Sequence, residues 1–254
     1  MLSGAHLHGI VLTAYDIQDS SRIVRLFTKE EGQLSFIARG ARRNKSRVLN
    51  LTEPFMEGTF HLQEGRSLFY IRDGQIQEAH LGLRRRPMRL ACAQMGVEAM
   101  GILPEREPDP GLYALLQRFL MVLEDADDAA PMRLLSAFLM KMASFLGFRP
   151  TLGACIECGK RMDPSSVFFD IASGGVFCEA HREVQSAKYM EMPIYEEICA
   201  YITQSLQDLE QTAASGKKEI YQGAFRITLE YFQTHTGKQH FKSLAILQRL
   251  AVLW

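Results

Sequence analysis

The sequence contains no long apolar run and no leader-like opening. Its apolar stretches stay well short of the about eighteen residues that a membrane-spanning helix requires. The opening residues, MLSGAHLHGIVLTAYD, lack a basic leader, a long apolar segment and a small-residue cleavage site, which argues against a signal peptide. We therefore expect a cytoplasmic protein, in which thiols stay reduced and clustered cysteines bind metal more often than they form disulfides.

The familiar sequence signatures of enzymes are also missing. The chain has no glycine-rich phosphate loop, no GxSxG, no HExxH, and no pair of carboxylates on an obvious rigid motif. Its 7 histidines are scattered along the chain. These absences argue against the common nucleotide-binding, serine-hydrolase and zinc-protease classes, so we expect a protein that is not an enzyme.

The composition is that of an ordinary globular protein. Apolar residues make up 47% and charged residues 23% of the 254 residues, which is enough for a packed core. The net charge is zero, but residues 1–90 carry 14 Lys and Arg against 9 Asp and Glu, whereas the rest of the chain is slightly acidic. A basic N-terminal segment in a neutral chain is a sign of nucleic-acid contact.

Short strands are predicted at the N-terminus. Five segments are rich in Val, Ile, Phe, Tyr and Thr and are separated by glycine-containing turns: 8–17, 21–32, 33–42, 53–65 and 66–80. The stretch TFHLQEGRSLFYI has the pattern of a hairpin around Gln63-Glu64-Gly65. Five strands with no long helix between them favour a small closed barrel, for which the OB type is the commonest solution. We place this barrel at residues 1–82.

Helical periodicity dominates the remainder. Arg89 to Leu103 reads as one helix ended by Pro104, and Pro131 suits a first helical turn. Apolar residues recur with helical spacing in four further stretches and close the chain in a fifth: 112–123, 134–146, 198–209, 225–232 and 243–253. We therefore expect an α+β multidomain fold, with a helical domain at 83–254 that a Cys/His insert interrupts at about 152–183.

Three of the 5 cysteines lie in this insert. The spacing Cys155-x2-Cys158-x19-Cys178-x2-His181 is typical of two close ligand pairs on one zinc ion, as in zinc ribbons. Gly159 would relieve crowding after the first pair, and the runs SVFFDI and GVFC predict a hairpin that returns the second pair to the first. Three thiolates and one imidazole predict one structural Zn²⁺ per chain.

Alternatives to this structural zinc remain open. A catalytic zinc is disfavoured, because four protein ligands leave no position for water or substrate. The third hypothesis is that the chain binds no metal. His181 is the least secure ligand, since Glu179 or a water could complete the shell instead. Cys92 and Cys199 fall at apolar helical positions and are read as small buried side chains.

A cationic loop follows the third predicted strand. In FIARGARRNKSRVLNLTEP, five cations and no acid fall within nine residues: Arg39, Arg42, Arg43, Lys45 and Arg47. A solvated surface usually mixes signs, so this loop favours nucleic-acid contact, in which guanidinium groups grip phosphates. If all five neutralised phosphates of a single strand, the logarithm of the affinity would fall with the logarithm of salt with a slope of roughly −3.5.

Two features near this loop stay ambiguous. The aromatic residues Phe36, Phe60, Phe69 and Tyr70 could stack on bases, but half of them must fill the barrel, and the sequence does not say which. The run 84–86, with Arg89 three residues on, either extends the basic track or caps the junction between barrel and helices.

The opening GIVLTAYDIQDSSRIVRLFTKEEGQLSFIARGAR, together with the LGACIECGK stretch, resembles the RecO family of bacterial recombination mediators, and the resemblance covers the whole chain. It implies a nucleoid-associated protein that binds single- and double-stranded DNA and anneals complementary strands. It also implies binding to the acidic C-terminal tail of the single-strand binding protein SSB, and action with RecR in loading RecA onto SSB-coated strands.

The resemblance places DNA contact on Arg39, Arg42 and Arg43, which fall on the basic motif of the family, and then on Lys45 and Arg47. The helical domain is the expected site for the SSB tail. The chain departs from the family at His181, where zinc-bearing members typically carry a fourth cysteine. Two other readings are a zinc-stabilised RNA-binding or protein-interaction module and, third, a metal-dependent nuclease.

Overall fold

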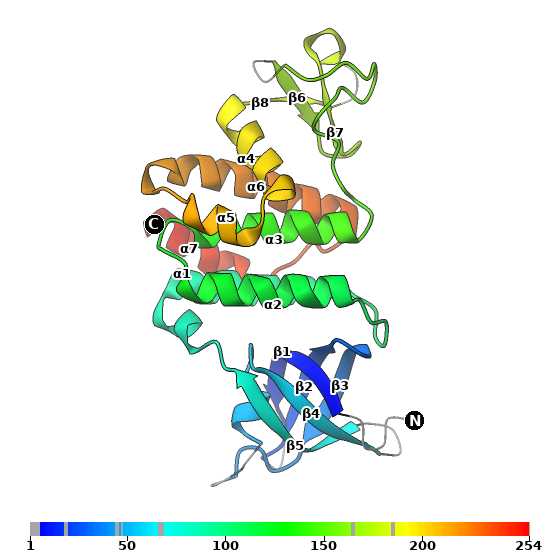
Figure 1. Ribbon diagram of the computed structural model, residues 1–254, viewed down its shortest axis with the longest axis vertical. Helices are drawn as coiled ribbons and strands as arrows, with labels where there is room; N and C mark the ends of the chain where they lie inside the picture. The colour runs from blue at the N-terminus through cyan, green and yellow to red at the C-terminus, as the bar shows by residue number, and fades with distance from the viewer. Residues whose placement is uncertain are drawn as a thin grey trace.

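The computed structural model describes residues 6–17, 20–43, 46, 48–65, 69–163, 166–183 and 186–253. A β-barrel lies at one end of the molecule, a group of helices in the middle and a small sheet at the other end (Figure 1). The expected α+β arrangement of an N-terminal barrel, a helical region and a Cys/His insert is confirmed.

The barrel consists of β1 (His6–Asp16), β2 (Arg22–Thr28), β3 (Gly32–Ala38), β4 (Glu57–Glu64) and β5 (Phe69–Glu78). The strands close in the order β1-β2-β3-β5-β4, and β1 pairs with β4. Of the paired barrel strands, β3 and β5 run parallel, over a short ladder, and the predicted antiparallel pairing of β4 with β5 is confirmed. This is the predicted five-stranded OB-type barrel. The predicted turn position is wrong, because Gln63 and Glu64 still belong to β4 and pair with Tyr70 and Phe69.

Alternation along the strands builds the barrel core. In β2 and β3, Val24, Leu26, Leu34 and Phe36 are buried inside, whereas the residues between them point outward. Aromatic side chains from β4 and β5 complete this core, with Phe36 and Phe60 ring centroids 6.2 Å apart. If one strand were shifted by one residue against its neighbour, all of its core side chains would face solvent. The alternation of buried residues therefore fixes the register of strand pairing.

In the part of the chain that the structure describes, seven helices follow the barrel: α1 (Pro87–Met100), α2 (Pro110–Asp125), α3 (Pro131–Phe145), α4 (Met192–Thr203), α5 (Leu206–Gln211), α6 (Lys218–Thr236) and α7 (Leu244–Leu253). Short 3-10 turns lie at Asn50–Thr52, Leu81–Arg85, Glu179–His181 and Ser215–Lys217. The first three helices carry proline in their first turn, where its missing N–H breaks no helical hydrogen bond. Among the described residues, no helix has both the length and the apolar character needed to cross a bilayer.

The stripe predicted as one helix over 198–209 is two helices, so that prediction is wrong in its continuity. Helix α4 ends at Thr203, and Ser205 begins α5. The Ser205 hydroxyl accepts a hydrogen bond from the Asp208 amide at 3.1 Å, and the Asp208 carboxylate accepts one from the Ser205 amide. This capping box starts a new helix although the apolar spacing runs on.

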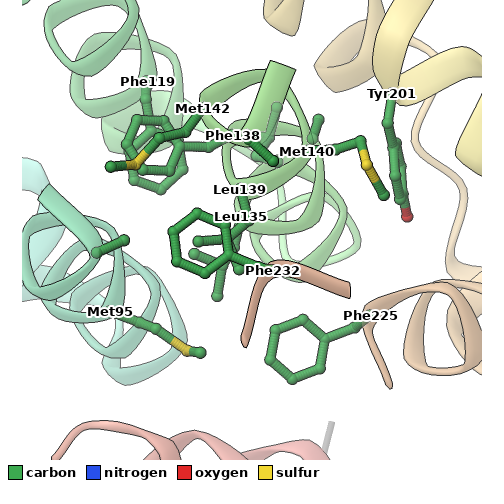
Figure 2. Close-up of a cluster of buried hydrophobic side chains, with 14 of the residues drawn as sticks. Met95, Phe119, Leu135, Phe138, Leu139, Met140, Met142, Tyr201, Phe225 and Phe232 are labelled. Atoms are coloured by element: carbon green, nitrogen blue, oxygen red, sulfur yellow. The ribbon is translucent and has the colours of Figure 1, made fainter. Parts of the chain in front are cut away.

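Helix α3 lies at the centre of the helical region. Nearly all of its residues are buried, and Figure 2 shows its Leu135, Phe138 and Met142 surrounded by side chains from other helices. The Phe119 and Phe138 rings stack with centroids 4.5 Å apart. A helix whose residues are mostly buried must be covered on most sides, and α1, α2, α4 and α6 pack around it.

The barrel packs directly against these helices. Ile10, Leu12 and Phe27 point out of the barrel and are buried in the same core as α1 and α2. The Gln33 amide donates hydrogen bonds to the carbonyls of Met100 at 2.6 Å and Leu103 at 3.0 Å. The outer face of the barrel is therefore covered by helices at one end.

The insert between α3 and α4 contains a three-stranded sheet in the order β7-β6-β8, formed by β6 (Val167–Asp170), β7 (Gly175–Phe177) and β8 (Lys188–Met190). The predicted hairpin between SVFFDI and GVFC is confirmed by the antiparallel pairing of β6 with β7. Gly174, at φ 70°, makes the turn that returns the chain to the first cysteine pair.

Candidate nucleic-acid interface and Cys/His cluster

The cationic loop begins directly after β3. Successive tight turns follow the strand, with the Arg43 amide donating to the Gly40 carbonyl and the Ser46 amide to the Arg43 carbonyl, both at 3.0 Å. Gly40 has φ 64°, which glycine adopts without strain, and Ala41 is buried against the barrel core. The buried alanine anchors the turn and leaves the neighbouring arginines exposed.

Of the five predicted DNA contacts, Arg39, Arg42 and Arg43 are exposed in the turns that follow β3. Lys45 and Arg47 lie outside the described residues. The Arg39 guanidinium stacks over the Tyr70 ring, 4.1 Å from its centroid, and the Arg43 Nε donates to the Ser20 hydroxyl at 3.3 Å.

Arg42 shares an acid with another arginine. Its Nη1 lies 3.6 Å from Asp16 Oδ2, while the Nε of the largely buried Arg22 donates to the other oxygen of Asp16 at 2.7 Å. The hydrogen bond from Arg22, followed by the charges of Arg22 and Arg42, lowers the pKa of Asp16 although partial burial opposes this. Arg22 therefore makes the closer contact with this carboxylate, and Arg42 remains exposed beside it.

The structure decides which aromatic residues can face a ligand. Phe36, Phe60 and Phe69 are buried in the barrel core and are not available for stacking. Tyr70 points outward and is half-buried beneath Arg39. Only one of the four candidates therefore belongs to the surface next to the cationic loop.

The second arginine run faces acidic partners and carbonyls. Arg84 lies 3.7 Å from Glu53 and 3.4 Å from the Pro54 carbonyl, and Arg86 lies 3.8 Å from Asp128. Arg89 donates to the carbonyl of Glu124. Of the two readings left open by the sequence, these contacts favour a cap at the junction of barrel and helices.

Sequence reasoning missed one cation next to the barrel surface. Lys242, just before α7, lies with its Nζ 5.8 Å from the Tyr15 ring centroid at the end of β1. The two residues are more than two hundred positions apart in the chain, so no local pattern could have paired them.

The four predicted metal ligands come together. The ligand atoms of Cys155, Cys158, Cys178 and His181 all lie within 4.8 Å of one another. Cys158 Sγ is 3.9 Å from Cys178 Sγ, and His181 Nδ1 is 3.3 Å from Cys178 Sγ and 3.8 Å from Cys155 Sγ. In a zinc tetrahedron with Zn–S near 2.3 Å, two sulfur atoms are roughly 3.8 Å apart, so the donor set and its spacing fit this ion.

Two tight turns place these ligands. The Gly159 amide donates to the Cys155 carbonyl at 2.8 Å, the Cys155 amide donates to the Lys160 carbonyl, and Gly159 has φ 70°. The chain leaves β7 at Phe177, and the His181 amide then closes a turn onto the Cys178 carbonyl at 2.9 Å. Each turn directs two donors to the same point.

His181, and not Glu179, lies together with the three thiols. The Glu179 carboxylate binds the Ser166 hydroxyl at 2.6 Å and the Arg182 guanidinium, so it is held away from the thiols. Burial raises the pKa of Cys155, but hydrogen bonds from the Cys178, Cys158 and Glu157 amides outweigh it and bring that pKa to about 6. The cluster could therefore hold a metal ion through thiolates and one imidazole.

Comparison with known proteins places both parts of the chain in one family. The family model described as Recombination protein O N terminal matches residues 2–80, and the model described as Recombination protein O C terminal matches residues 84–245.

Curated relatives support the same family assignment. DNA repair protein RecO of Caldanaerobacter subterraneus subsp. tengcongensis is 28% identical over 244 residues, covering 95% of this chain and 96% of its own. DNA repair protein RecO of Symbiobacterium thermophilum is 38% identical over 176 residues, covering 68% and 69%. DNA repair protein RecO of an Anaeromyxobacter species is 36% identical over 176 residues, covering 68% of each chain. With its closed barrel, helical region and Cys/His insert, the chain belongs to the RecO family of DNA repair proteins.

Proposed function

We propose that this RecO-family protein binds single- and double-stranded DNA, anneals complementary strands and helps RecR to load RecA onto SSB-coated single strands. The observation that carries the proposal is the exposed group Arg39, Arg42 and Arg43, which follows a barrel strand with a buried alanine as its anchor. In this proposal residues 1–82 supply the DNA surface, extended by Lys45 and Arg47, and residues 83–254 supply the partner surface.

The mechanism needs no bond to be made or broken. Two DNA strands repel each other through their phosphates, and binding a cationic surface releases the counterions that otherwise screen them. A loop that holds two strands side by side lowers this repulsion and raises their local concentration, so pairing becomes faster. Guanidinium groups suit this task because they grip phosphates bidentately without reading base sequence.

The partner proposal rests on the family and on the helical region. Capture of the acidic SSB tail by the helices would pull SSB locally off the strand and leave that stretch free to pair or to pass on to RecR and RecA. A coating protein with many such tails would be engaged repeatedly, which raises the effective concentration of the complex at the strand.

We further propose that Cys155, Cys158, Cys178 and His181 hold one structural Zn²⁺ per chain. The ion would supply a cross-link between the Cys155–Cys158 turn and the turn that follows β7. Four protein donors leave no position for a substrate, and Cys155 is buried at the base of the insert. The zinc would therefore support the fold of the insert, while DNA contact is made at the barrel.

Annealing of two complementary labelled strands tests this proposal, with and without SSB. We expect the Arg42→Ala/Arg43→Ala variant to anneal several-fold more slowly than the wild type. A variant that loses the same charge at exposed positions of the insert, Lys160→Ala/Arg161→Ala, should keep the wild-type rate.

Further measurements separate the remaining alternatives. Competition with RNA of equal length distinguishes an RNA-binding module, because the proposal requires DNA to bind at least as well. Intact strands after incubation with Mg²⁺ are expected and would count against a nuclease. Capture of a peptide with an acidic, aromatic C-terminus tests the SSB handover, and a wild-type protein that neither binds nor anneals DNA would overturn the proposal.

A further inference from the structure

Four outward-facing side chains form a row across the barrel. Tyr15 on β1 lies opposite Ile23 on β2, Ile23 lies opposite Ile37 on β3, and Ile37 lies opposite Tyr70 on β5. Residues directly opposite one another on neighbouring strands project from the same face of a sheet. We call this set of four side chains the outer row.

The outer row is apolar although it faces solvent. Tyr15 is 53% and Ile23 39% exposed, and Ile37 and Tyr70 are half-buried. Outward-facing positions of a small barrel are expected to be polar unless something covers them. A contiguous exposed apolar surface of this kind marks an interaction site.

At the other end of this barrel face, outward-facing apolar residues are buried against the helices. There, the outward-facing Leu12 and Phe27 are covered by the helices and belong to their core. No described residue of the chain covers the outer row in the same way, since Tyr15 and Ile23 keep large exposed surfaces. The outer row therefore has the composition of a contact surface, although among the described residues no helix covers it as the helices cover Leu12 and Phe27.

Cations stand at both ends of the outer row. The Arg39 guanidinium lies 4.1 Å over the Tyr70 ring at one end, and Lys242 Nζ lies 5.8 Å from the Tyr15 ring at the other. Arg42 adds a third cation beside Asp16, the residue after Tyr15. A ligand that fits must offer apolar faces in its middle and negative charge along its length.

A hollow adjoins the Tyr15 end. It has a volume of about 280 Å³ between β1, α1 and α7, and its walls include Tyr15, Lys242, Glu98 and the 52% exposed Ile246. The Glu98 carboxylate accepts hydrogen bonds from the Ser243 amide at 3.3 Å and hydroxyl at 3.1 Å, which holds the loop that carries Lys242 in place. The apolar surface thus continues from the barrel onto the helical region.

We propose that the outer row binds the unstacked bases of single-stranded DNA, with Arg39 and Lys242 on the adjacent phosphates. Bases have apolar faces and their backbone is anionic, so this ligand matches the charge and the apolarity of the row together. With strands about 4.8 Å apart, the row spans roughly 14 Å, which is enough for a short run of bases. The inference rests on the proposed function and names the part of the DNA that this face contacts.

Duplex DNA does not fit the outer row, because its base faces are stacked inside the helix. Contacts of the outer row would therefore make the protein prefer single-stranded DNA. The arginine loop, which would contact phosphates, can bind both single-stranded and duplex DNA. The two contacts also differ in their response to salt, since stacking releases no counterions and phosphate contact does.

The test replaces the two tyrosines in the Tyr15→Ser/Tyr70→Ser variant and measures binding of a labelled oligothymidylate and of a duplex at several salt concentrations. We expect roughly 5- to 100-fold weaker single-strand binding, an unchanged salt slope and less than a twofold change for the duplex. Tyr189→Ser, at a 59% exposed tyrosine of the insert, is the matched control and should bind as the wild type does. Photo-crosslinking to a 5-iodouracil strand should label Tyr15 or Tyr70.

Single-strand affinity within twofold of the wild type would overturn the inference, whatever the variant does to protein partners. Equal losses for single strands and duplex would overturn it as well, because the row would then act without contacting bases. A wild-type protein that binds no DNA would contradict the proposed function itself, so the two failures are distinct. Circular dichroism and melting temperature show whether the variant keeps the wild-type fold.

Discussion

His80 Nδ1 lies 2.9 Å from Glu124 Oε2, which ties the segment leaving the barrel to helix α2. On its other side, His80 Nε2 is 3.8 Å from Oε2 of the buried Glu57 on β4. A buried imidazole thus lies between one carboxylate of the barrel and one of the helical region. The junction of the two parts is held by charge as well as by apolar packing.

This contact predicts a pH-dependent stability. Burial opposes the charged form of His80, but its hydrogen bond to Glu124 and the nearby carboxylate of Glu57 outweigh burial and raise its pKa above 6.5. A raised pKa means that the stabilisation is complete below about pH 6.5, the unfolded value, and is lost as pH rises through the folded value. We expect the melting temperature to fall as pH rises above about 6.5.

The His80→Asn variant isolates this effect. His80 has φ 44°, a left-handed conformation that asparagine tolerates well, so the substitution removes the charge with little backbone strain. The difference in melting temperature between wild type and variant should shrink as pH rises. A difference that stays constant from about pH 6 to pH 8 would show that His80 does not titrate in this range.

The barrel and the helical region approach each other closely at Gly32. It has φ 67°, and a Cβ built there would lie 2.2 Å from the carbonyl oxygen of Glu107. Gly32→Ala should therefore lower the free energy of unfolding by more than the about 1–2 kcal/mol of left-handed strain. Gly237→Ala is the control, because its φ is 73° and no atom lies within 4 Å of its Cβ position. Equal losses for both variants in chemical denaturation would contradict the close packing at Gly32.

The buried ion pair of Arg133 and Glu197 predicts a large loss of stability. Arg133 Nη1 also donates to the Leu209 carbonyl at 2.6 Å and to the Thr212 hydroxyl at 2.8 Å, so one side chain joins α3 to α4 and α5. Removing one partner of such a buried pair costs about 3–5 kcal/mol.

Urea unfolding of Arg133→Met should therefore show a loss of this size. The control is Arg182→Met, which removes the partner of Glu179 in an exposed pair and should cost at most about 1 kcal/mol. Arg133→Met combined with Glu197→Leu should recover part of the loss, because no unpaired charge is then buried. A single variant as stable as the wild type would refute this role of Arg133.

Metal removal should loosen the insert and spare the rest. We expect about one zinc per purified chain by elemental analysis, none in Cys158→Ser and wild-type content in Cys199→Ser, whose thiol lies on α4. The core around α3 is built by helices outside the insert, so far-UV circular dichroism should change little.

Limited proteolysis locates the effect. New cleavage in Cys158→Ser should fall between about residue 151 and residue 190, since the metal cross-link is local. Cleavage spread over the barrel and helices would show that zinc supports the whole chain. A zinc-free wild-type protein with a protected insert would contradict the zinc assignment.

Much of this fold is predictable because the relevant forces are local in sequence. Alternation in β2 and β3 predicts the barrel, and the spacing of Cys155, Cys158, Cys178 and His181 predicts the cluster. The strand pattern acts over a few residues and the ligand pattern over two close pairs within one insert, so both can be recognised without knowledge of the tertiary structure.

The rest depends on contacts between distant segments. The α4–α5 break is set by one serine cap that the apolar periodicity of 198–209 conceals. The covering of Phe27 and the exposure of Ile23, two outward residues of one strand, depend on where the helices lie. Lys242 meets Tyr15 only after the chain has folded.

The cationic loop is the proposed DNA contact, and the salt dependence of single-strand binding tests this role most directly. Each phosphate contact contributes about −0.7 to the slope of log affinity against log salt, so losing two contacts should flatten it by roughly 1.4. We expect this flattening for Arg42→Ala/Arg43→Ala and none for Lys160→Ala/Arg161→Ala in the insert, at the opposite end of the molecule from the barrel (Figure 1). A slope equal to that of the wild type in the Arg42/Arg43 variant would contradict the assignment of DNA contact to this loop.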